Sequence, residues 1–506
     1  MSHEMTRRDF SRLLGTAALG ISVGSVNEEA ERMVVKSQAP DDLCFTSAVD
    51  LAAMIRAKKV SSREVMQAHL AQIDRVNPAV NAVVTLVADR AMADAAAADE
   101  ELAKGKSRGP LHGLPIAHKD LVATKGIRTT QGSPFYRDFV PESDAPIITL
   151  IRKGGAITVG KTNTPEFGAG SHTFNTVFGA TKNPYDVTRS CGGSSGGAAV
   201  ALACGMVPIA DGSDTGGSLR NPAAFCNVVG FRPSPGRVSI GRGSWSPLST
   251  SGPMARSVAD AALFLSVLAA PDVRNPTVII DDPARFRGRL DRSFKGTRVA
   301  FYKDLGGLPF EPEIRRVVGE SRKVFESLGC VVEEAEPDFD GIGDAFPALR
   351  HSDYYAHYSA MAKQKPEWIK DTIHWEISEA ERQSAADVAR ASARQDLMYA
   401  QTQSFFQKYD YFVLPVTQVE PFDVTIKYPT SVAGVPMATY IDWMRSCWYV
   451  TMMANPAISV PAGFTSSRLP VGLQIVGRHR DDWSVLQMAH AFEQATKHAL
   501  RRPSVA

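Results

Sequence analysis

The sequence predicts an α/β protein in which helices cover a mixed or parallel β-sheet. Strand-like and helix-like patterns alternate along most of the chain, for example at residues 297–301, 312–328 and 330–334, and such alternation is typical of α/β architectures. Of the 506 residues, 44% are hydrophobic and 22% are charged, which is ordinary for a globular protein. A chain of this length is long enough to bury a large core.

The N-terminus combines a basic segment with a short apolar run. Arg7 and Arg8 lie shortly before Phe10, and the apolar run covers residues 13–23, which is too short to span a membrane as a helix. A basic region before such a run is typical of an export signal, and the paired arginines resemble a twin-arginine signal. We therefore expect a periplasmic or secreted protein. The alternative is a cytoplasmic protein whose N-terminus is a frayed basic helix. The expected division is an export signal at 1–25, a mobile polar lead-in at 26–43 and a folded domain at 44–506.

The first long helix of the folded region is expected to begin at Ser61. Ser61 and Glu64 have the spacing of a capping box, which satisfies free N–H groups at a helix start, and apolar residues follow on one face. We expect this helix to end at Asn77-Pro78. The elements expected next are a strand at 81–87, an alanine-rich helix to about residue 104, a strand or turn at 113–119, a helix at 144–153 and a strand at 156–159.

The middle of the chain is expected to alternate in the same way and then to change. A helix at 195–203 and a strand at 207–211 flank glycine-rich turns, and a helix is expected at 256–268. Residues 340–409 break the alternation with a largely helical pattern rich in aromatic residues: Tyr354, Tyr355, Tyr358, Trp368 and Trp375. Aromatic residues are more often core than ligand contacts, yet this insertion is the best candidate for a lid or pocket wall. The elements expected after it are a strand at 411–416, a long loop at 417–439, a helix at 440–453, a strand near 471–476 and a helix near 482–497.

Composition excludes several classes of function. The net charge is +2, which gives no case for nucleic-acid binding. None of the six cysteines has Cys-x-x-Cys spacing, so a zinc or redox site is not expected, and the thiols are expected to be mostly buried. No metal-binding or nucleotide-binding motif stands out. We therefore expect no metal and no cofactor.

Two serine-bearing glycine turns and one lysine carry the chemistry. The turn at 192–197 contains Ser194 and the turn at 211–220 contains Ser218, and the two serines are 24 positions apart. Glycine-rich turns can aim several N–H groups at one anion, which suits an oxyanion hole. A serine nucleophile needs a base. Lys119 follows an apolar run and can serve as that base if burial keeps its amine neutral. The nearest histidine, His118, is the other candidate base.

Several motifs in order resemble the amidase signature family. They are Gly-Leu-Pro-Ile-Ala-His-Lys-Asp at 113–120, Lys-Thr-Asn-Thr-Pro-Glu-Phe at 161–167, Gly-Gly-Ser-Ser-Gly-Gly at 192–197, Asp-Thr-Gly-Gly-Ser-Leu-Arg at 214–220 and Asn-Pro-Ala-Ile-Ser-Val-Pro at 455–461. The resemblance covers roughly residues 45–497. It implies a single large α/β/α domain with a mixed, mostly parallel, twisted central sheet.

The resemblance also implies a Ser-Ser-Lys triad. Ser218 matches the family's nucleophile, Ser194 the bridging serine that follows a cis peptide bond, and Lys119 the base. The implied oxyanion donors are the backbone N–H groups of Thr215, Gly216, Gly217 and Ser218. Asp214 and Arg220 are interpreted as a structural pair beside the nucleophile. Two roles stay open for His118: it tunes the proton affinity of Lys119, or it merely fills a position in the strand. We favour the second.

The expected function is hydrolysis of a carboxylic amide through an acyl-enzyme on Ser218. The residues expected to line the substrate pocket are Phe174, Cys191, Gly193, Trp443 and Cys447. In the glutaminase subunit of tRNA-dependent amidotransferases, a glutamate occupies the position of Phe174. Apolar aryl or alkyl amides are therefore favoured over glutamine. The alternatives are a carbamate (urethane) or ester hydrolase of the same family, the glutaminase subunit, and a non-catalytic binding protein. We expect a small-molecule amide as the only partner, no stable membrane insertion, and a monomer or homodimer.

Overall fold

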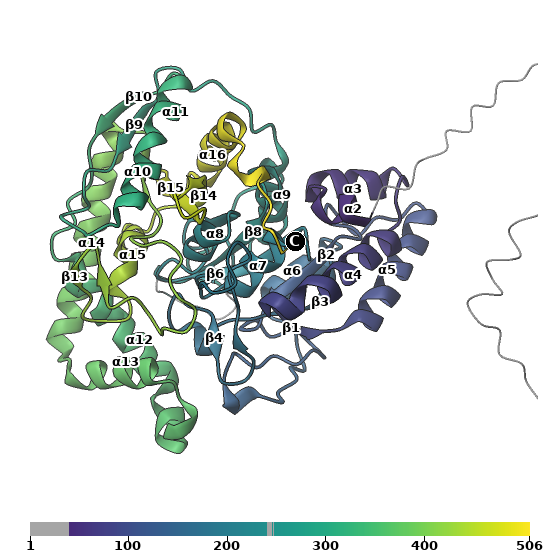
Figure 1. The fold of residues 1–506 in the computed structure, drawn as a ribbon, viewed down its shortest axis with the longest axis horizontal. Helices are drawn as coiled ribbons and strands as arrows, with labels where there is room; N and C mark the ends of the chain where they lie inside the picture. The colour runs from purple at the N-terminus through teal and green to yellow at the C-terminus, as the bar shows by residue number, and fades with distance from the viewer. Residues whose placement is uncertain (1–39, 240–244, 246, 506) are drawn as a thin grey trace, which may run out of the picture. The chain divides into compact units, whose positions relative to one another are not determined.

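An eleven-stranded mixed sheet organises the computed structural model, which describes residues 40–239, 245 and 247–505 (Figure 1). The strand order is β1-β3-β2-β6-β8-β7-β14-β15-β11-β9-β10. The strands are β1 (Val83–Leu86), β2 (Pro115–Lys119), β3 (Ile157–Thr162), β6 (Ile209–Asp214), β7 (Val229–Arg232), β8 (Thr250–Ala255), β9 (Arg298–Phe301), β10 (Val331–Glu334), β11 (Tyr411–Pro415), β14 (Ala457–Phe464) and β15 (Pro470–Val476). Two small hairpins pair β4 (Phe174–Asn175) with β5 (Gly179–Ala180), and β12 (Ser431–Val432) with β13 (Val435–Pro436).

The predicted α/β class with a mixed sheet is confirmed. Parallel pairs join β3, β2 and β6 on one flank and β11, β9 and β10 on the other. The strands between them pair antiparallel, so the centre differs from the mostly parallel pairing that we expected. The reason is connectivity, because β14 and β15 are joined by a short loop and parallel neighbours need a long crossover.

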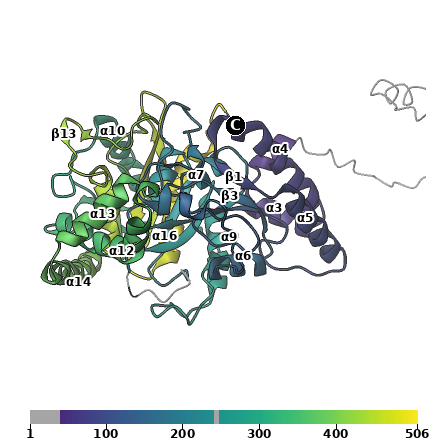
Figure 2. The same cartoon turned by 90° about the horizontal axis from the view of Figure 1, so that it is seen from below.

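Helices pack along this sheet. They are α2 (Pro40–Phe45), α3 (Ala48–Arg56), α4 (Ser62–Val80), α5 (Ala88–Ala103), α6 (Pro146–Lys153), α7 (Gly196–Ala203), α8 (Arg220–Phe225), α9 (Val258–Leu268), α10 (Pro312–Glu320), α11 (Arg322–Ser327), α12 (Ile342–Gln364), α13 (Asp371–Arg382), α14 (Ala385–Lys408), α15 (Arg445–Met452) and α16 (Asp482–Thr496). Helices α12, α13 and α14 gather at one end of the domain, whereas α3, α4 and α5 lie at the other (Figures 1 and 2). The helical stretch expected at 340–409 is therefore present.

Helix α4 shows which local signals were reliable. Its N-cap is Ser61, and both hydrogen bonds of the capping box to Glu64 are made. The expected stop at Asn77-Pro78 is wrong, because Pro78 lies inside the helix and the chain turns only at Asn81, which has a left-handed backbone. The Asn77 side chain instead binds the backbone of Ala82 and Val83 and so fixes the start of β1.

Helix α7 lies wholly within the core. All of its residues are buried, and it packs against β2, β3 and β6. A Cβ on Gly197 would lie 2.4 Å from the backbone nitrogen of Asn163, which is closer than real Cβ atoms approach. Glycine at this position therefore lets the helix sit directly on the chain that follows β3.

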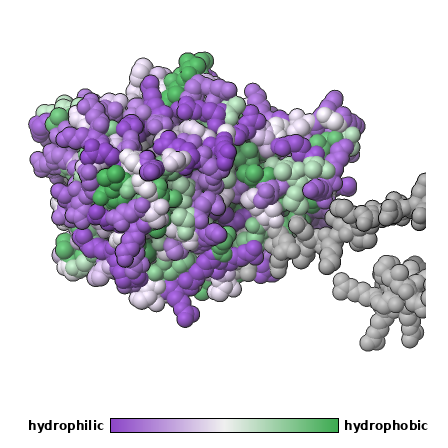
Figure 3. Space-filling view, turned by 90° about the horizontal axis from the view of Figure 1, so that it is seen from above, coloured by the Kyte–Doolittle hydropathy of each residue, from purple (hydrophilic) through white to green (hydrophobic). Residues whose placement is uncertain are grey.

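The N-terminal predictions fall mostly outside the described residues. This holds for the export signal at 1–25 and for all but the end of the lead-in at 26–43, where α2 already begins at Pro40. Residues Ala39–Ala506 form one compact unit. Within the described part of the chain, no helix combines the length and apolarity needed to cross a bilayer. The face shown in Figure 3 is largely hydrophilic, with small hydrophobic patches scattered over it.

Candidate active site

Three segments bring the predicted residues together at one edge of the sheet. Strand β2 ends at Lys119, and its parallel neighbour β6 ends at Asp214, just before the turn that carries Ser218. Ser194 stands directly before Ser195, the N-cap of α7. Because the ends of neighbouring parallel strands meet at the same edge, Lys119 and the turn that carries Ser218 become neighbours.

Lys119 is fully buried among hydroxyl groups. Its Nζ lies 2.7 Å from Ser194 Oγ, 2.9 Å from Ser195 Oγ and 3.0 Å from Ser213 Oγ. Burial lowers the pKa of Lys119 to about 7, although the carboxylates of Asp214 and Asp211 oppose the shift. A substantial share of this lysine is therefore neutral near pH 7, which is the state that a general base requires.

His118 lies behind the lysine and does not contact its amine. Its Nδ1 is 2.6 Å from Asp211 Oδ1 and its Nε2 is 3.0 Å from Thr158 Oγ1, all in the buried interior. Neighbouring side chains on a strand point to opposite faces, so His118 faces away from the serines. Asp211 links the two residues, because its Oδ2 accepts the Lys119 backbone N–H at 3.4 Å.

Asp214 binds the backbone of the turn that carries Ser218. One carboxylate oxygen accepts the Gly217 N–H at 3.0 Å and the other accepts the Leu219 N–H at 3.1 Å. The Gly217 N–H is thus already engaged, which departs from its predicted place among the oxyanion donors. Within the described chain, the N–H groups of the other three predicted donors, Thr215, Gly216 and Ser218, have no intramolecular acceptor. The peptide bond between Gly193 and Ser194 is cis, as the resemblance implies.

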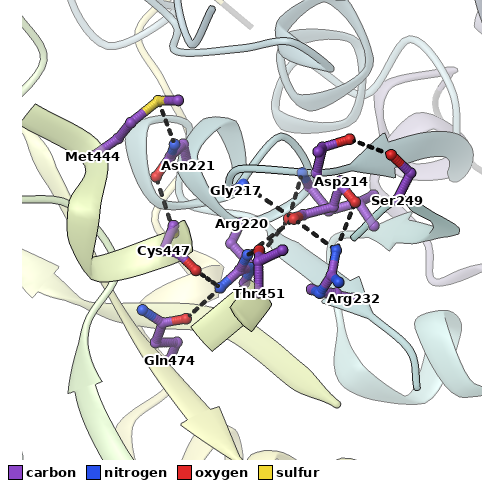
Figure 4. Close-up of polar contacts among 12 residues, drawn as sticks. Asp214, Gly217, Arg220, Asn221, Arg232, Ser249, Met444, Cys447, Thr451 and Gln474 are labelled. Atoms are coloured by element: carbon purple, nitrogen blue, oxygen red, sulfur yellow. Dashed lines mark hydrogen bonds and ion pairs between the residues drawn. The ribbon is translucent and has the colours of Figure 1, made fainter. Parts of the chain in front are cut away.

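Two buried arginines neutralise Asp214 (Figure 4). Arg220 binds both carboxylate oxygens, at 2.9 and 3.0 Å, and Arg232 approaches to 3.2 Å. Burial raises the pKa of Asp214, but the guanidinium groups and N–H donors outweigh it and hold the pKa well below its usual range. Arg220 also donates to the carbonyl of Cys447 and to Gln474, so it ties the turn to α15 and β15.

A cavity of about 170 Å³ opens in front of the serines. Its lining includes Ser194, Ser213, Thr215, Gly216 and Ser218. The Ser218 side chain is largely buried, with 8% of the residue exposed. The other lining residues are Leu121, Phe167, Gly168, Gly170, Leu248, Ser249, Arg350, Asp353, Tyr354, Tyr358 and Met444. Four of them come from α12, so the helical insertion does form a wall of the cavity.

The five residues predicted for the substrate pocket do not line this cavity. Among the described residues that line it, none of the five is present. Phe174 packs on His172 and Lys370, and Trp443 packs on Phe422. The Sγ atoms of Cys191 and Cys447 donate to the carbonyl of Thr181 and to Asn221, respectively. Gly193 abuts His172. Nearness in sequence to the glycine turns places these residues near the site, but it does not reveal the direction of a side chain.

Sequence reasoning missed several wall residues and found others. Tyr354 and Tyr358 were singled out with the insertion, and both line the cavity, one helical turn apart. Arg350 was missed although it lies one turn earlier on the same face, and that i, i+4 spacing was the available signal. It is buried and binds Glu376 at 2.7 Å, with the Tyr354 and Tyr440 hydroxyls at 3.0 and 2.7 Å.

Comparison with known proteins places this site in a family. The family model described as Amidase matches residues 64–486, and the chain belongs to the amidase signature family. The chain is 35% identical to an acylamidase of Rhodococcus erythropolis, over 92% of this chain and 98% of the relative. It is also 36% identical to one subunit of the glutamyl-tRNA(Gln) amidotransferase from Chromohalobacter salexigens, over 90% and 97%.

Solved structures agree with this assignment. A bacterial aryl acylamidase of the amidase signature family superposes with a TM-score of 0.84 at 28% identity, covering 90% of this chain and 98% of that one. The peptide amidase of Stenotrophomonas maltophilia superposes with a TM-score of 0.76 at 28% identity, covering 91% and 99%. The protein is therefore an amidase enzyme.

Proposed function

We propose that the protein hydrolyses apolar aryl or alkyl amides to an acid and an amine through an acyl-enzyme on Ser218. The observation that carries the proposal is the buried 2.7 Å contact between Lys119 Nζ and Ser194 Oγ, at a cavity that Ser218 also lines. A neutral amine and two hydroxyl groups at one cavity form a proton path between nucleophile and base.

The steps balance with one water consumed. Neutral Lys119 accepts a proton from Ser194 as Ser194 accepts one from Ser218, whose oxygen attacks the amide carbon. The N–H groups of Gly216 and Ser218 stabilise the oxyanion. Ser194 then donates a proton to the leaving nitrogen and regains one from protonated Lys119, the C–N bond breaks and the amine departs. Water, deprotonated by the same relay, attacks the ester carbon and releases the acid and Ser218.

The cavity wall supports an aromatic or alkyl substrate. Phe167 and Tyr358 stack with their ring centroids 4.4 Å apart, and Tyr354 packs beside Tyr358 at 5.4 Å. Leu121, Leu248 and Met444 add apolar surface. Aromatic faces favour offset stacking with a further ring. The printed names of two relatives, acylamidase and aryl acylamidase, are consistent with this substrate class.

Carbamates, esters and glutamine are the alternatives that an assay separates. Aryl carbamates and esters present the same electrophilic carbon to Ser218. Glutamine is the less favoured alternative, although amidotransferase subunits are as similar in sequence as the acylamidase. The lining combines aromatic and aliphatic groups with the charged side chains of Arg350 and Asp353, so L-glutamine is included in the assay as a direct test.

The test measures amine release from an anilide, a fatty primary amide, a peptide amide, an aryl carbamate and L-glutamine. We expect turnover of the anilide, loss of that turnover in Ser218→Ala, and retention in the matched control Ser327→Ala, whose serine is exposed on α11. Mass spectrometry of the quenched reaction should find the acyl group on the peptide that contains Ser218. Turnover of glutamine alone, or full activity in Ser218→Ala, would overturn the proposal.

A further inference from the structure

One wall of the active-site cavity presents a guanidinium group whose hydrogen bonds are only partly made. Arg350 is 4% exposed and lines the cavity. Its Nε donates to Glu376 at 2.7 Å, and its Nη2 donates to the hydroxyls of Tyr354 and Tyr440 at 3.0 and 2.7 Å. No described residue accepts a hydrogen bond from Nη1. This nitrogen is also not one of the unpartnered polar atoms that are wholly cut off from solvent, so its N–H groups are open to the space that Arg350 lines.

The hydroxyl of Tyr354 supplies a second donor beside the first. It accepts the bond from Arg350 Nη2, which leaves its own proton free, and no residue in the described chain accepts that proton. Tyr354 also lines the cavity, one helical turn after Arg350 on α12. Tyr440 differs, because its hydroxyl donates to Glu376 and does not line the cavity. Two donors without acceptors thus stand side by side at the wall, and such donors are costly to leave unpaired.

Buried partners hold the guanidinium of Arg350 in one place. Glu376 is fully buried, and one of its oxygens accepts from both Arg350 Nε and the Tyr440 hydroxyl. Its other oxygen binds the His351 ring. The guanidinium carbon lies 4.4 Å from the centroid of the Tyr354 ring. A guanidinium that is already fixed loses little conformational entropy when it donates to a ligand, so Nη1 is suited to recognition.

The charges around the two donors favour a neutral acceptor over an anion. The Glu376 carboxylate already balances Arg350, and Asp353 adds a negative side chain to the cavity lining. Asp353 does not take Nη1, because its ion contact is with His357, at 3.5 Å. A ligand carboxylate would therefore share the cavity with a like charge. A carbonyl oxygen offers two lone pairs to two donors without adding charge.

The two donors are set back from the reacting serines. A Cβ on Gly168 would lie 3.4 Å from Ser194 Oγ. A Cβ on Gly170 would lie 3.4 Å from the Tyr440 ring, whose hydroxyl binds Arg350. The loop from Gly168 to Gly170 therefore leads from the bridging serine to the residues around the guanidinium. A ligand oxygen at Nη1 must accordingly be separated by several bonds from the amide that is cleaved.

We propose that Arg350 and Tyr354 form an acceptor subsite, which selects substrates that carry a neutral carbonyl oxygen apart from the amide that is cleaved. Arg350 Nη1 and the Tyr354 hydroxyl both donate to this oxygen, while the apolar lining holds the rest of the substrate. The inference rests on the proposed amide hydrolysis and narrows its substrate class. Arg350 is thus a residue for specificity and takes no part in proton transfer.

The kinetic test compares anilides that differ only in this oxygen. 4-Oxopentananilide and 4-methylpentananilide differ on the acyl side, and 4'-acetylacetanilide and 4'-isopropylacetanilide differ on the amine side. The ratio of kcat/KM for ketone over isostere is compared between enzymes, which cancels the intrinsic reactivity of each substrate. In at least one pair we expect this ratio to fall about fivefold in Tyr354→Phe and to keep its wild-type value in the matched control Tyr355→Phe, an exposed neighbour on α12.

A second variant and a crystal structure complete the test. Arg350→Lys keeps a positive charge beside Glu376 but lacks Nη1, so the ratio should fall about tenfold or more. Tyr354→Phe keeps the aromatic packing, so the conclusion does not depend on whether Arg350→Lys folds. Crystals of Ser218→Ala soaked with each ketone should place the ketone oxygen of at least one within about 3.2 Å of Arg350 Nη1.

The outcomes separate the subsite from the hydrolysis. Ratios in Tyr354→Phe that equal those of the wild type for both pairs would overturn the subsite, and so would soaked crystals in which no ketone oxygen lies at Nη1. Turnover of none of the four anilides by the wild type would overturn the proposed hydrolysis instead. The soaked crystals would then still decide whether Arg350 and Tyr354 bind a carbonyl oxygen.

Discussion

The pH dependence of catalysis should report the protonation of Lys119. Because burial sets the pKa of Lys119 to about 7, the neutral fraction is about 1% at pH 5 and about 99% at pH 9. If the neutral amine is the base, log(kcat/KM) should rise with unit slope below pH 7 and level off above it. The acid limb should therefore span about a hundredfold between pH 5 and the plateau.

Replacing Asp211 by asparagine should move this limb to lower pH. The Asp211 carboxylate raises the pKa of Lys119, second to that of Asp214. Two unit charges about 6 Å apart interact by about 2 to 3 kcal/mol at an effective dielectric constant of about 20. Removing that charge should lower the pKa of Lys119 by about one to two units. Asparagine keeps an oxygen for the His118 ring, so the strand packing should survive.

The assay is kcat/KM for the anilide from pH 5 to pH 9 at constant ionic strength, for wild type, Asp211→Asn and the control Asp396→Asn. Circular dichroism confirms that each variant is folded at every pH. We expect the acid limb of Asp211→Asn to move to lower pH and that of the control to stay at its wild-type position. A limb that stays at its wild-type position in Asp211→Asn, or that moves to higher pH, would refute the assignment of Lys119 as the base.

Three further predictions concern the pocket, the fold and export. Tyr358→Ala should lower kcat/KM for the anilide about tenfold by removing an aromatic wall, whereas Tyr355→Ala, an exposed neighbour on α12, should leave it unchanged; equal effects would exclude the wall. Asp214→Asn leaves buried Arg220 without its carboxylate and should lower the free energy of unfolding by about 3–5 kcal/mol in urea titrations, and a change within error would show that the pair is dispensable. Replacing both Arg7 and Arg8 by lysine should retain the protein in the cytoplasm upon cell fractionation, and unchanged export, or a wild type that is never exported, would contradict the signal.

Local sequence signals predicted the framework of the site and the helical insertion that forms one wall, but not the other residues that line the cavity. The capping box at Ser61, the strand that delivers Lys119 and the two serine turns follow from short-range spacing, and the structure contains each of them. The engagement of the Gly217 N–H by Asp214 depends on side-chain geometry inside the turn. No spacing rule reveals it.

Long-range contacts explain most of what was missed. Strands β7, β8 and β14 were not predicted as elements, because β8 and β14 contain proline and all three lack a clear alternation. Arg350 lines the cavity because α12 packs on α15 and shares the cavity with the turn after β6, which depends on how the insertion folds back. The predicted pocket residues Cys191 and Cys447 are indeed close to the turns, but they face the core.

The bonds that Arg220 makes to Cys447 and Gln474 have a consequence for the order in which the protein is assembled. Arg220 and Gln474 are 254 residues apart in sequence, and β14 and β15 stand in the middle of the sheet between β7 and β11. A ribosome that has completed Lys119, Ser194 and Ser218 has therefore made every proposed catalytic side chain but not the surroundings that hold the nucleophile turn. The nascent chain should remain inactive until its last strands emerge, and a truncation before β15 should yield no partial enzyme.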